Sequence, residues 1–119
     1  MRAVSIIHHR VSDFDAWKAI YDSEGVGGMQ RAGGVLEHAV LRSPDDPNMV
    51  IVVHTFASQD AAHAFFAENA DLKDAMGRAG VDFASFTVEF LDEVAAGRIA
   101  EAAVYRRPDY SWRPAWRSF

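Results

Sequence analysis

The sequence predicts an α+β domain of the split βαβ, ferredoxin-like type, with the element order strand, helix, strand, strand, helix, strand. Three observations lead to this fold class. Four short segments rich in apolar and β-branched residues, at 2–10, 35–42, 49–56 and 82–94, predict strands. Apolar residues at helical spacing separate the first strand from the second and the third from the fourth. The turn sequence S-P-D-D-P-N joins the two middle strands directly. We expect one antiparallel four-stranded sheet with both helices on one face.

The first helix is predicted to begin at Ser12, after a strand whose centre is V-S-I-I. The sequence S-D-F-D fits a capping box, and its aspartates suit the positive end of the helix dipole. One apolar stripe follows at helical spacing and comprises Phe14, Trp17, Ile20 and Tyr21. We expect this helix to end before V-G-G-M-Q-R-A-G-G, whose glycines predict a loop.

The second helix is predicted to begin after Ser58, which supplies an N-cap side chain. Its apolar residues are Ala61, Ala62, Phe65 and Phe66, and after Asn69 a further turn or two carries Leu72, Ala75 and Met76. Gly80 fits the position just after a helix, where the left-handed conformation is common, and the long fourth strand follows it.

The length of 119 residues fits a single domain with its own core. Half of the residues are hydrophobic and about a quarter are charged, as in ordinary soluble globular proteins. No apolar run approaches the roughly 18 residues needed to cross a membrane, and the N-terminus shows no signal-peptide pattern. The absence of cysteine excludes disulfides, thiolate metal sites and a cysteine nucleophile. We therefore expect a cytoplasmic protein without membrane association.

Charge is distributed unevenly along the chain. Residues 1–95 carry 7 Lys and Arg against 15 Asp and Glu, whereas residues 96–119 carry 5 Arg against 2 acidic residues. An acidic body repels phosphate, so we expect no nucleic-acid partner. We divide the chain into a ferredoxin-like domain at 1–95 and a basic, aromatic C-terminal extension at 96–119. The extension is expected to pack on the body or on a second copy, where it could act as a lid.

Both faces of the predicted sheet are apolar. The segment M-V-I-V-V-H-T-F has apolar residues at both parities, and Phe83, Phe86 and Phe90 also occupy both parities of the last strand. The helices can cover only one of these faces, and the other would be left as a large exposed apolar patch. A second copy of the same sheet is the economical cover, so we expect a homodimer.

Three stretches of the sequence resemble dimeric α+β barrel proteins. These are V-S-D-F-D-A-W-K-A-I-Y-D, A-G-G-V-L-E-H-A-V-L-R-S-P-D-D-P-N-M-V-I-V-V and L-K-D-A-M-G-R-A-G-V. Within that superfamily, the chain is similar to the small stand-alone proteins related to antibiotic biosynthesis monooxygenases and often labelled cyclase. The resemblance covers residues 3–94 and implies the fold and dimerisation. For chemistry it admits cofactor-free oxygenation, polyketide cyclisation, haem degradation, dismutation and decarboxylation, because fold does not settle function.

Two histidine pairs are candidates for chemistry, and the first is His8 with His9. Adjacent residues of a strand point to opposite faces, so these two imidazoles cannot share one metal or one substrate.

The second pair is His38 with His54, on the two strands of the predicted hairpin. If the hairpin is centred on Asp46, the two histidines are directly opposed on one face, about 5 Å apart at Cβ. If its centre lies between Asp45 and Asp46, they point to opposite faces. The turn sequence permits either register.

The apolar stripe of the first helix has two interpretations. Phe14 and Ile20 are expected in the core, whereas Trp17 and Tyr21 either join the core or line an apolar cleft between helix and sheet. For such a cleft we predict the catalytic residues His38, His54, His9 and Tyr21. The predicted substrate-binding residues are His8, Trp17, Phe56, Phe83 and Trp112.

Other chemistries have less support. The histidines lack the spacing of a metal site, a haem-degrading residue set is not apparent, and we expect no metal and no cofactor. The motif G-x-S-x-G is absent, Ser5 and Ser85 lie in mid-strand, and the glycines fit no phosphate-binding motif.

The sequence therefore predicts a protein that binds a small apolar molecule, aromatic or polyketide-like, and acts on it as a cofactor-independent monooxygenase or cyclase. His or Tyr would serve as acid, base or oxyanion donor. The alternative is a non-catalytic ligand-binding or stress-related protein of the same fold. A metal- or haem-dependent enzyme is the third possibility.

Overall fold

The computed structural model describes residues 1–67 and 69–99, and within them it confirms the α+β, ferredoxin-like fold. The four strands are β1 (Ala3–Val11), β2 (Glu37–Arg42), β3 (Met49–Phe56) and β4 (Val81–Asp92). The helices come as two pairs, α1 (Phe14–Tyr21) with α2 (Glu24–Ala32), and α3 (Gln59–Phe66) with α4 (Ala70–Arg78). The second predicted helical segment is thus a pair of short helices, and the first predicted helix is followed by a further helix, α2.

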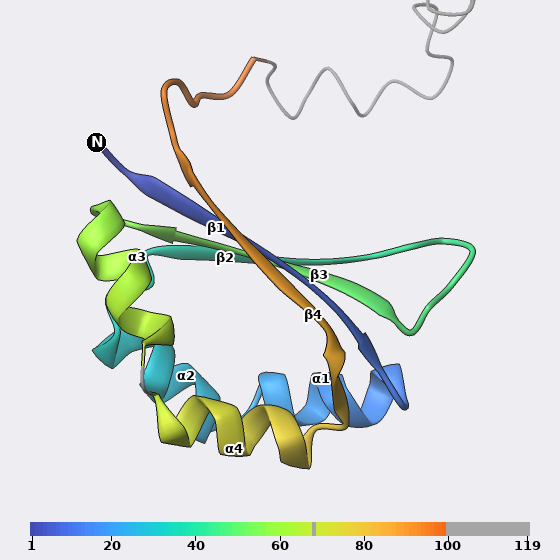
Figure 1. Ribbon diagram of the computed structural model, residues 1–119. Helices are drawn as coiled ribbons and strands as arrows, with labels where there is room; N and C mark the ends of the chain where they lie inside the picture. Colours follow the sequence, from blue (N-terminus) through green and yellow to red (C-terminus); the bar gives the residue numbers. More distant parts are fainter. Residues whose placement is uncertain (68, 100–119) are drawn as a thin grey trace, which may run out of the picture.

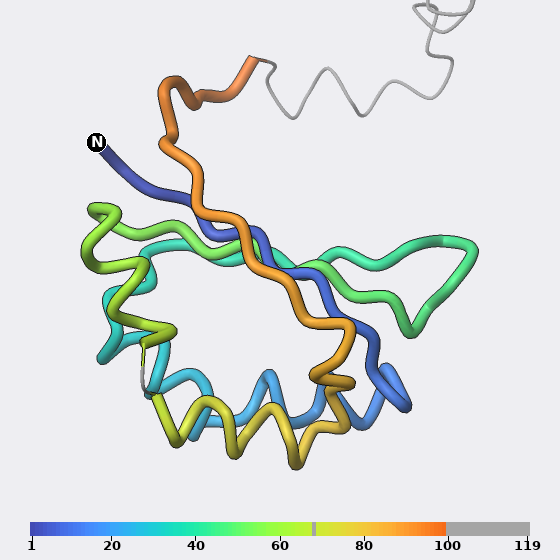
Figure 2. The backbone as a smooth tube through the Cα atoms, viewed as in Figure 1, coloured from blue at the N-terminus to red at the C-terminus, as the bar shows by residue number. Residues whose placement is uncertain are grey.

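The strands form one antiparallel sheet in the order β2-β3-β1-β4, with β1 and β3 at its centre. All four helices lie on the same side of this twisted sheet (Figure 1). The path of the chain shows how each helix pair leaves the sheet and returns to it as the next strand (Figure 2). We call the side that packs on the helices the helix face and the other side the open face.

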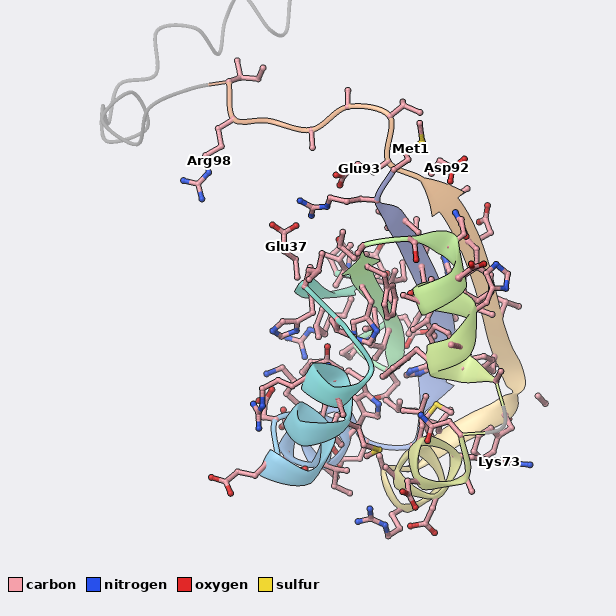
Figure 3. All side chains as sticks on the ribbon, turned by 90° about the vertical axis from the view of Figure 1, so that its left-hand side faces the viewer. Met1, Glu37, Lys73, Asp92, Glu93 and Arg98 are labelled. Atoms are coloured by element: carbon pink, nitrogen blue, oxygen red, sulfur yellow. The ribbon has the colours of Figure 1, made fainter. Side chains whose placement is uncertain are left out.

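In the two central strands, β1 and β3, the side chains of the helix face are buried. In β1 the residues of the helix face are buried, namely Ala3, Ser5, Ile7, His9 and Val11. The residues between them are half-buried or exposed. On β3 the helix face carries Val50, Val52, His54 and Phe56, and all four are buried. Between sheet and helices, side chains fill the interior, while Lys73 on α4 points outward (Figure 3).

Helix capping is partly as predicted. Ser58 caps α3 by accepting from the backbone N–H of Ala61, and Gly80 follows α4 with a φ of 81°. The prediction that Ser12 caps the first helix is wrong, since Asp13 is the N-cap and accepts from Ala16. An aspartate carboxylate is as good an N-cap acceptor as a serine hydroxyl, and it adds a favourable charge at the helix N-terminus.

The prediction of a loop through V-G-G-M-Q is also wrong, because these residues lie inside α2. Ser23 caps this helix through an acceptor contact to the N–H of Val26, and Val26 itself is buried. Glycine within a helix costs roughly 1 kcal/mol relative to alanine. Capping and burial of the apolar side of α2 outweigh that cost here, as tertiary packing commonly does.

The hairpin register follows the first of the two alternatives. His38 pairs directly with His54, and Val40 pairs with Val52, so the hairpin is centred on Asp46. Both histidines therefore lie on the helix face. The opposite orientation of His8 and His9 is confirmed as well, since His9 is 3% exposed on the helix face and His8 is exposed on the open face.

An irregularity in β4 changes which of its residues share a face. Arg10 pairs with Asp82, but His8 pairs with Thr87, so four residues of β4 lie opposite His9. This bulge reverses the parity of the strand. Phe83, Phe86 and Phe90 consequently all lie on the helix side, where they contact or adjoin residues of α3 and α4. The prediction that these phenylalanines occupy both faces is wrong.

The open face is apolar at its centre and charged at its rim. Val4, Ile6, Met49, Ile51 and Val53 are half-buried, and Leu41 and Leu91 are exposed. At one end Arg2 forms ion pairs with Glu37 and Glu93, and at the other Arg10 pairs with Asp46. No described helix covers this face (Figure 1).

Beyond β4, residues 93–99 carry neither helix nor strand, and Val94 and Ile99 are exposed. The predicted packing of the extension at 96–119, including Trp112, falls mostly outside the described residues. None of the described helices is long and apolar enough to cross a membrane.

Candidate functional site

A cavity of about 60 Å³ lies between the helix face and the helices. Its walls come from β1, β3 and all four helices, and they are mainly apolar. The apolar and sulfur-containing side chains are Ile7, Ile20, Val26, Met29, Val52, Phe65, Phe66, Leu72, Ala75, Met76 and Ala79, and the remaining ones are His9, Trp17, Tyr21, Gln30 and His54.

One wall of the cavity is a column of aromatic rings. Trp17 stacks on Tyr21 with 5.0 Å between ring centroids, and His9 and Trp17 form a T-shaped pair at 5.6 Å. Behind this wall Phe86, which does not line the cavity, stacks on His9 with 6.2 Å between ring centroids. The spacing of Trp17 and Tyr21 by one helical turn puts both rings over the sheet, and Trp17 is only 3% exposed.

Four polar side chains meet at one corner of the cavity, which we call the polar corner: Tyr21, Gln30, His38 and His54. The Tyr21 hydroxyl lies 2.9 Å from Nδ1 of His38 and 3.4 Å from Nε2 of His54. The Gln30 amide nitrogen donates to the Tyr21 oxygen at 3.1 Å and lies 3.2 Å from Nε2 of His54. Four residues distant in sequence thus share one hydrogen-bond network.

Burial sets the protonation of the corner. It lowers the pKa of His54 from 6.5 to about 4, with repulsion from His38 as a second cause, so His54 is neutral at pH 7. Burial also raises the pKa of Tyr21, and the hydrogen bond from Gln30 only partly offsets this. Tyr21 is therefore a protonated donor. At the far end of the aromatic wall, burial lowers the pKa of His9.

The hydrogen bonds of the polar corner run in one direction, from Gln30 through Tyr21 to His38. Gln30 directs its amide nitrogen to the Tyr21 oxygen and to Nε2 of His54, so both of these atoms accept. With its oxygen accepting from Gln30, Tyr21 has its own proton free for Nδ1 of His38. His38 is exposed, so this bond connects the cavity with the surface.

None of the described side chains that line the cavity is Lys, Arg, Asp or Glu. A charged ligand group would enter an apolar space without a counter-charge, which is costly. The arrangement instead suits a mostly apolar molecule with one uncharged polar group, such as a carbonyl or an enol hydroxyl, at the polar corner.

A second, more open depression lies outside the cavity, and we call it the outer groove. It has a volume of about 430 Å³ and runs between α4 and the start of β4. Phe66, Leu72 and Met76 line both spaces and form the wall between them. A dry cavity of about 150 Å³ accommodates benzene, so a cavity of about 60 Å³ takes an aromatic ring only if this wall moves.

The structure brings some of the predicted site residues together and separates others. His9, Trp17, Tyr21 and His54 line the cavity, and His38 joins them through Tyr21. The other predicted residues lie elsewhere: His8 is exposed on the open face, Phe56 is fully buried in the core beside Phe65, and Phe83 lines the outer groove. Trp112 lies outside the described residues.

Gln30 is the member of the site that sequence reasoning missed, because α2 was interpreted as a loop. Val26, Met29 and Gln30 have the spacing of one helix face, and all three line the cavity. This spacing is the sequence pattern from which a helix, and Gln30 as a site residue, could have been predicted. Among the described residues, no group of three His, Cys, Asp or Glu side chains could hold a metal ion.

Comparison with known proteins places the chain in a family and its fold in a larger group. A family model described as Domain of unknown function (DUF3764) matches residues 2–91. No curated protein gives a significant match.

Solved structures share the fold at low sequence identity. SnoaB, a cofactor-independent oxygenase from Streptomyces nogalater, is 17% identical with a TM-score of 0.58, over 84% of this chain and 98% of that one. A candidate antibiotic biosynthesis monooxygenase from Chloroflexus aurantiacus is 23% identical with a TM-score of 0.60, over 84% of this chain and 100% of that one. Another from Caulobacter crescentus is 18% identical with a TM-score of 0.61, over 79% and 91%. The chain therefore has the fold of antibiotic biosynthesis monooxygenase-like α+β barrel proteins, as the resemblance implied.

Proposed function

This chain belongs to the family described as Domain of unknown function (DUF3764), and from its site we propose that it oxygenates an uncharged aromatic or polyketide-like molecule without a cofactor. The observation that carries the proposal is the 2.9 Å contact of the Tyr21 hydroxyl, at the cavity, with the exposed imidazole of His38. This contact supplies a route for a proton from an otherwise apolar enclosure to solvent. The likeness in fold to SnoaB, a cofactor-independent oxygenase, supports the proposal.

The proposed reaction needs only a substrate that can form an enolate. The enol hydroxyl of the substrate gives its proton to the Tyr21 oxygen as the Tyr21 proton moves to Nδ1 of His38. The two transfers occur together because burial disfavours a free tyrosinate. The enolate carbon then forms a bond to O₂ and reduces it to a peroxide anion, which takes back the proton from His38 through Tyr21. The resulting hydroperoxide loses water as its O–O bond and the remaining C–H bond break. The net change, R₂CH₂ + O₂ → R₂C=O + H₂O, balances in atoms and electrons, with one oxygen atom in the product and the other in water.

The remaining side chains would hold the substrate and exclude water. Gln30 fixes Tyr21 and the neutral His54 with its two amide protons. The aromatic wall offers ring faces to a flat molecule. Entry is from the outer groove, past Phe66, Leu72 and Met76, and the flexible thioether of Met76 suits a wall that must rearrange.

We further propose that the protein works as a homodimer formed through the open face. The support is the apolar centre of this face, around Ile6, Ile51 and Val53, with the charged rim described above. An unpartnered apolar centre of this kind marks an interaction surface.

The test uses anthrone, an uncharged tricyclic ketone whose enol is accessible, and measures O₂ uptake by purified protein without added metal, flavin or haem. We expect turnover that falls on the order of 10²–10⁴-fold in both Tyr21→Phe and His38→Ala. His63→Ala is the matched control, because His63 is an exposed histidine on α3 that lines neither the cavity nor the outer groove. Its rate should stay at the wild-type level.

Two results would contradict this proposal. If Tyr21→Phe and His38→Ala turn over anthrone at the wild-type rate, the relay is wrong. If anthrone and 1-naphthol raise the melting temperature of the protein but no O₂ is consumed, the site binds without oxygenating, and the non-catalytic alternative takes its place.

A further inference from the structure

Three buried polar atoms on the helix face have no hydrogen-bond partner within the described residues: Oγ of Ser5, Nδ1 of His9 and Nδ1 of His54. Ser5 is 0% exposed and His54 is 4% exposed. The cost of an unpartnered polar group is greatest in such surroundings, so each of these atoms calls for an explanation.

Ser5 and His54 are direct neighbours in the sheet, whereas His9 pairs with Val50. Ser5 of β1 pairs with His54 of β3, and both side chains lie on the helix face. Directly opposed residues have Cβ atoms roughly 5 Å apart, so rotation about the Cα–Cβ bond of Ser5 can bring its hydroxyl to the imidazole. Among the described residues, no other residue with an unpartnered buried polar atom is paired with Ser5 or His54 in the sheet.

The hydrogen bonds of the polar corner then decide where the proton of neutral His54 resides. Nε2 accepts from the Gln30 amide nitrogen at 3.2 Å, so it carries no proton. The proton is therefore on Nδ1, and this N–H is the buried donor that lacks an acceptor. A serine oxygen is a suitable acceptor.

We propose that Ser5 is a positioning residue, which accepts the Nδ1 proton of His54 and so fixes the direction of the whole hydrogen-bond network from the sheet to the surface. Ser5 holds His54 in the Nδ1–H form, and Nε2 accepts from Gln30. Gln30 donates to Tyr21, and Tyr21 donates to His38.

The opposite arrangement shows why the direction matters. If His54 carried its proton on Nε2, Gln30 would have to turn its amide oxygen towards His54 and Tyr21. The Tyr21 hydroxyl would then donate to Gln30 rather than to His38. In that state Tyr21 cannot pass its proton to the surface. The significance of Ser5 for turnover rests on the proposed function, whereas its effect on the tautomer does not.

The experiment is an ¹⁵N–¹H correlation spectrum of the imidazoles in the full-length protein at about pH 7.5, without ligand. It compares wild type with Ser5→Ala and Ser5→Thr. Pyrrole-type and pyridine-type nitrogens are distinct in such a spectrum, so the tautomer of each neutral histidine is read directly. We expect wild-type His54 to be protonated on Nδ1, Ser5→Ala to shift the major form to Nε2–H, and Ser5→Thr, which keeps a hydroxyl, to retain Nδ1–H.

His9 and His63 serve as internal controls, because neither is paired with Ser5 in the sheet and their spectra should not change. A wild-type His54 in the Nε2–H form overturns the inference, and so does a Ser5→Ala variant whose His54 tautomer is unchanged. If Ser5→Thr does not fold because of its added methyl group, Ser5→Ala alone decides. In an anthrone assay Ser5→Ala should lower turnover on the order of 10-fold, as loss of a supporting partner commonly does. Absence of turnover in wild type would contradict the proposed function and leave the spectral test intact.

Discussion

The buried neutral imidazole of His54 should make the fold sensitive to mild acid. In the unfolded chain His54 takes up a proton with the ordinary pKa of 6.5, whereas in the folded protein its pKa is about 4. Between these values the unfolded state binds more protons than the native state. The free energy of unfolding therefore rises with pH in this window and falls as the pH is lowered from 6.5 to 4. Below pH 4 both states are protonated and this contribution changes no further.

The size of the effect follows from the two pKa values. One pKa unit corresponds to about 1.4 kcal/mol, so a shift from 6.5 to about 4 amounts to about 3.4 kcal/mol in total, and about three quarters of this is expressed at pH 4.5. We expect His54 to reduce the free energy of unfolding by about 2.5 kcal/mol between pH 7.5 and 4.5. This loss is a large fraction of the roughly 5–15 kcal/mol that is the total free energy of unfolding of a typical domain.

Urea unfolding at pH 7.5 and 4.5, at fixed protein concentration, measures this loss for wild type and for His54→Gln. The glutamine keeps a neutral polar group but does not titrate. Between pH 7.5 and 4.5, His54→Gln should therefore lose about 2.5 kcal/mol less of its free energy of unfolding than wild type loses. His63→Gln is the matched control, because His63 is exposed on α3, and it should follow wild type. Equal pH dependence in all three proteins would refute the assignment of a buried neutral His54.

Three further predictions concern the fold and the assembly. Gly80→Ala should lower the free energy of unfolding, measured in urea, by about 1–3 kcal/mol, because the φ of Gly80 is 81° and a Cβ there would lie 2.4 Å from Oγ of Ser12. Gly28→Ala in α2 is the control and should be neutral or stabilising, because a Cβ at Gly28 meets nothing within 4 Å. Light scattering at micromolar concentration should give a dimer, and Val53→Asp on the open face should unfold it, whereas Thr87→Asp on the same face of the edge strand should be tolerated. Deletion of residues 108–119 should lower the melting temperature or ligand affinity, and a silent deletion would remove the idea of a lid.

The sequence was sufficient for the fold because its strands and helices carry strong periodic signals. The turn S-P-D-D-P-N, the Ser58 cap and Gly80 are local features whose physics does not depend on the rest of the chain. The opposed faces of His8 and His9 follow from strand geometry alone. The hairpin register could not be decided in advance, because a shift of one residue leaves the turn chemistry unchanged while it reverses every side chain.

The errors occurred where tertiary packing overrides local preference. Glycine content argued against a helix at 24–32, yet the burial of Val26 and the partial burial of Met29 at the cavity sustain α2. Gln30 was lost from the predicted site for that reason. Ser5 gave no signal at all, since a serine in mid-strand is unremarkable until the residue across the ladder is known to be a buried histidine.

The bulge in β4 has the widest consequence for function. It moves Phe83, Phe86 and Phe90 to one side of the strand, so the aromatic residues expected to support a dimer interface instead enlarge the helix side, where Phe86 stacks on His9. On the open face β4 then contributes mainly Thr87, Glu89 and the exposed Leu91. The apolar centre of that face consequently lies on β1 and β3. In the proposed homodimer a second copy therefore packs across the middle of the sheet, with β4 at its polar margin, which is why a charge at Val53 should destroy the assembly and one at Thr87 should not.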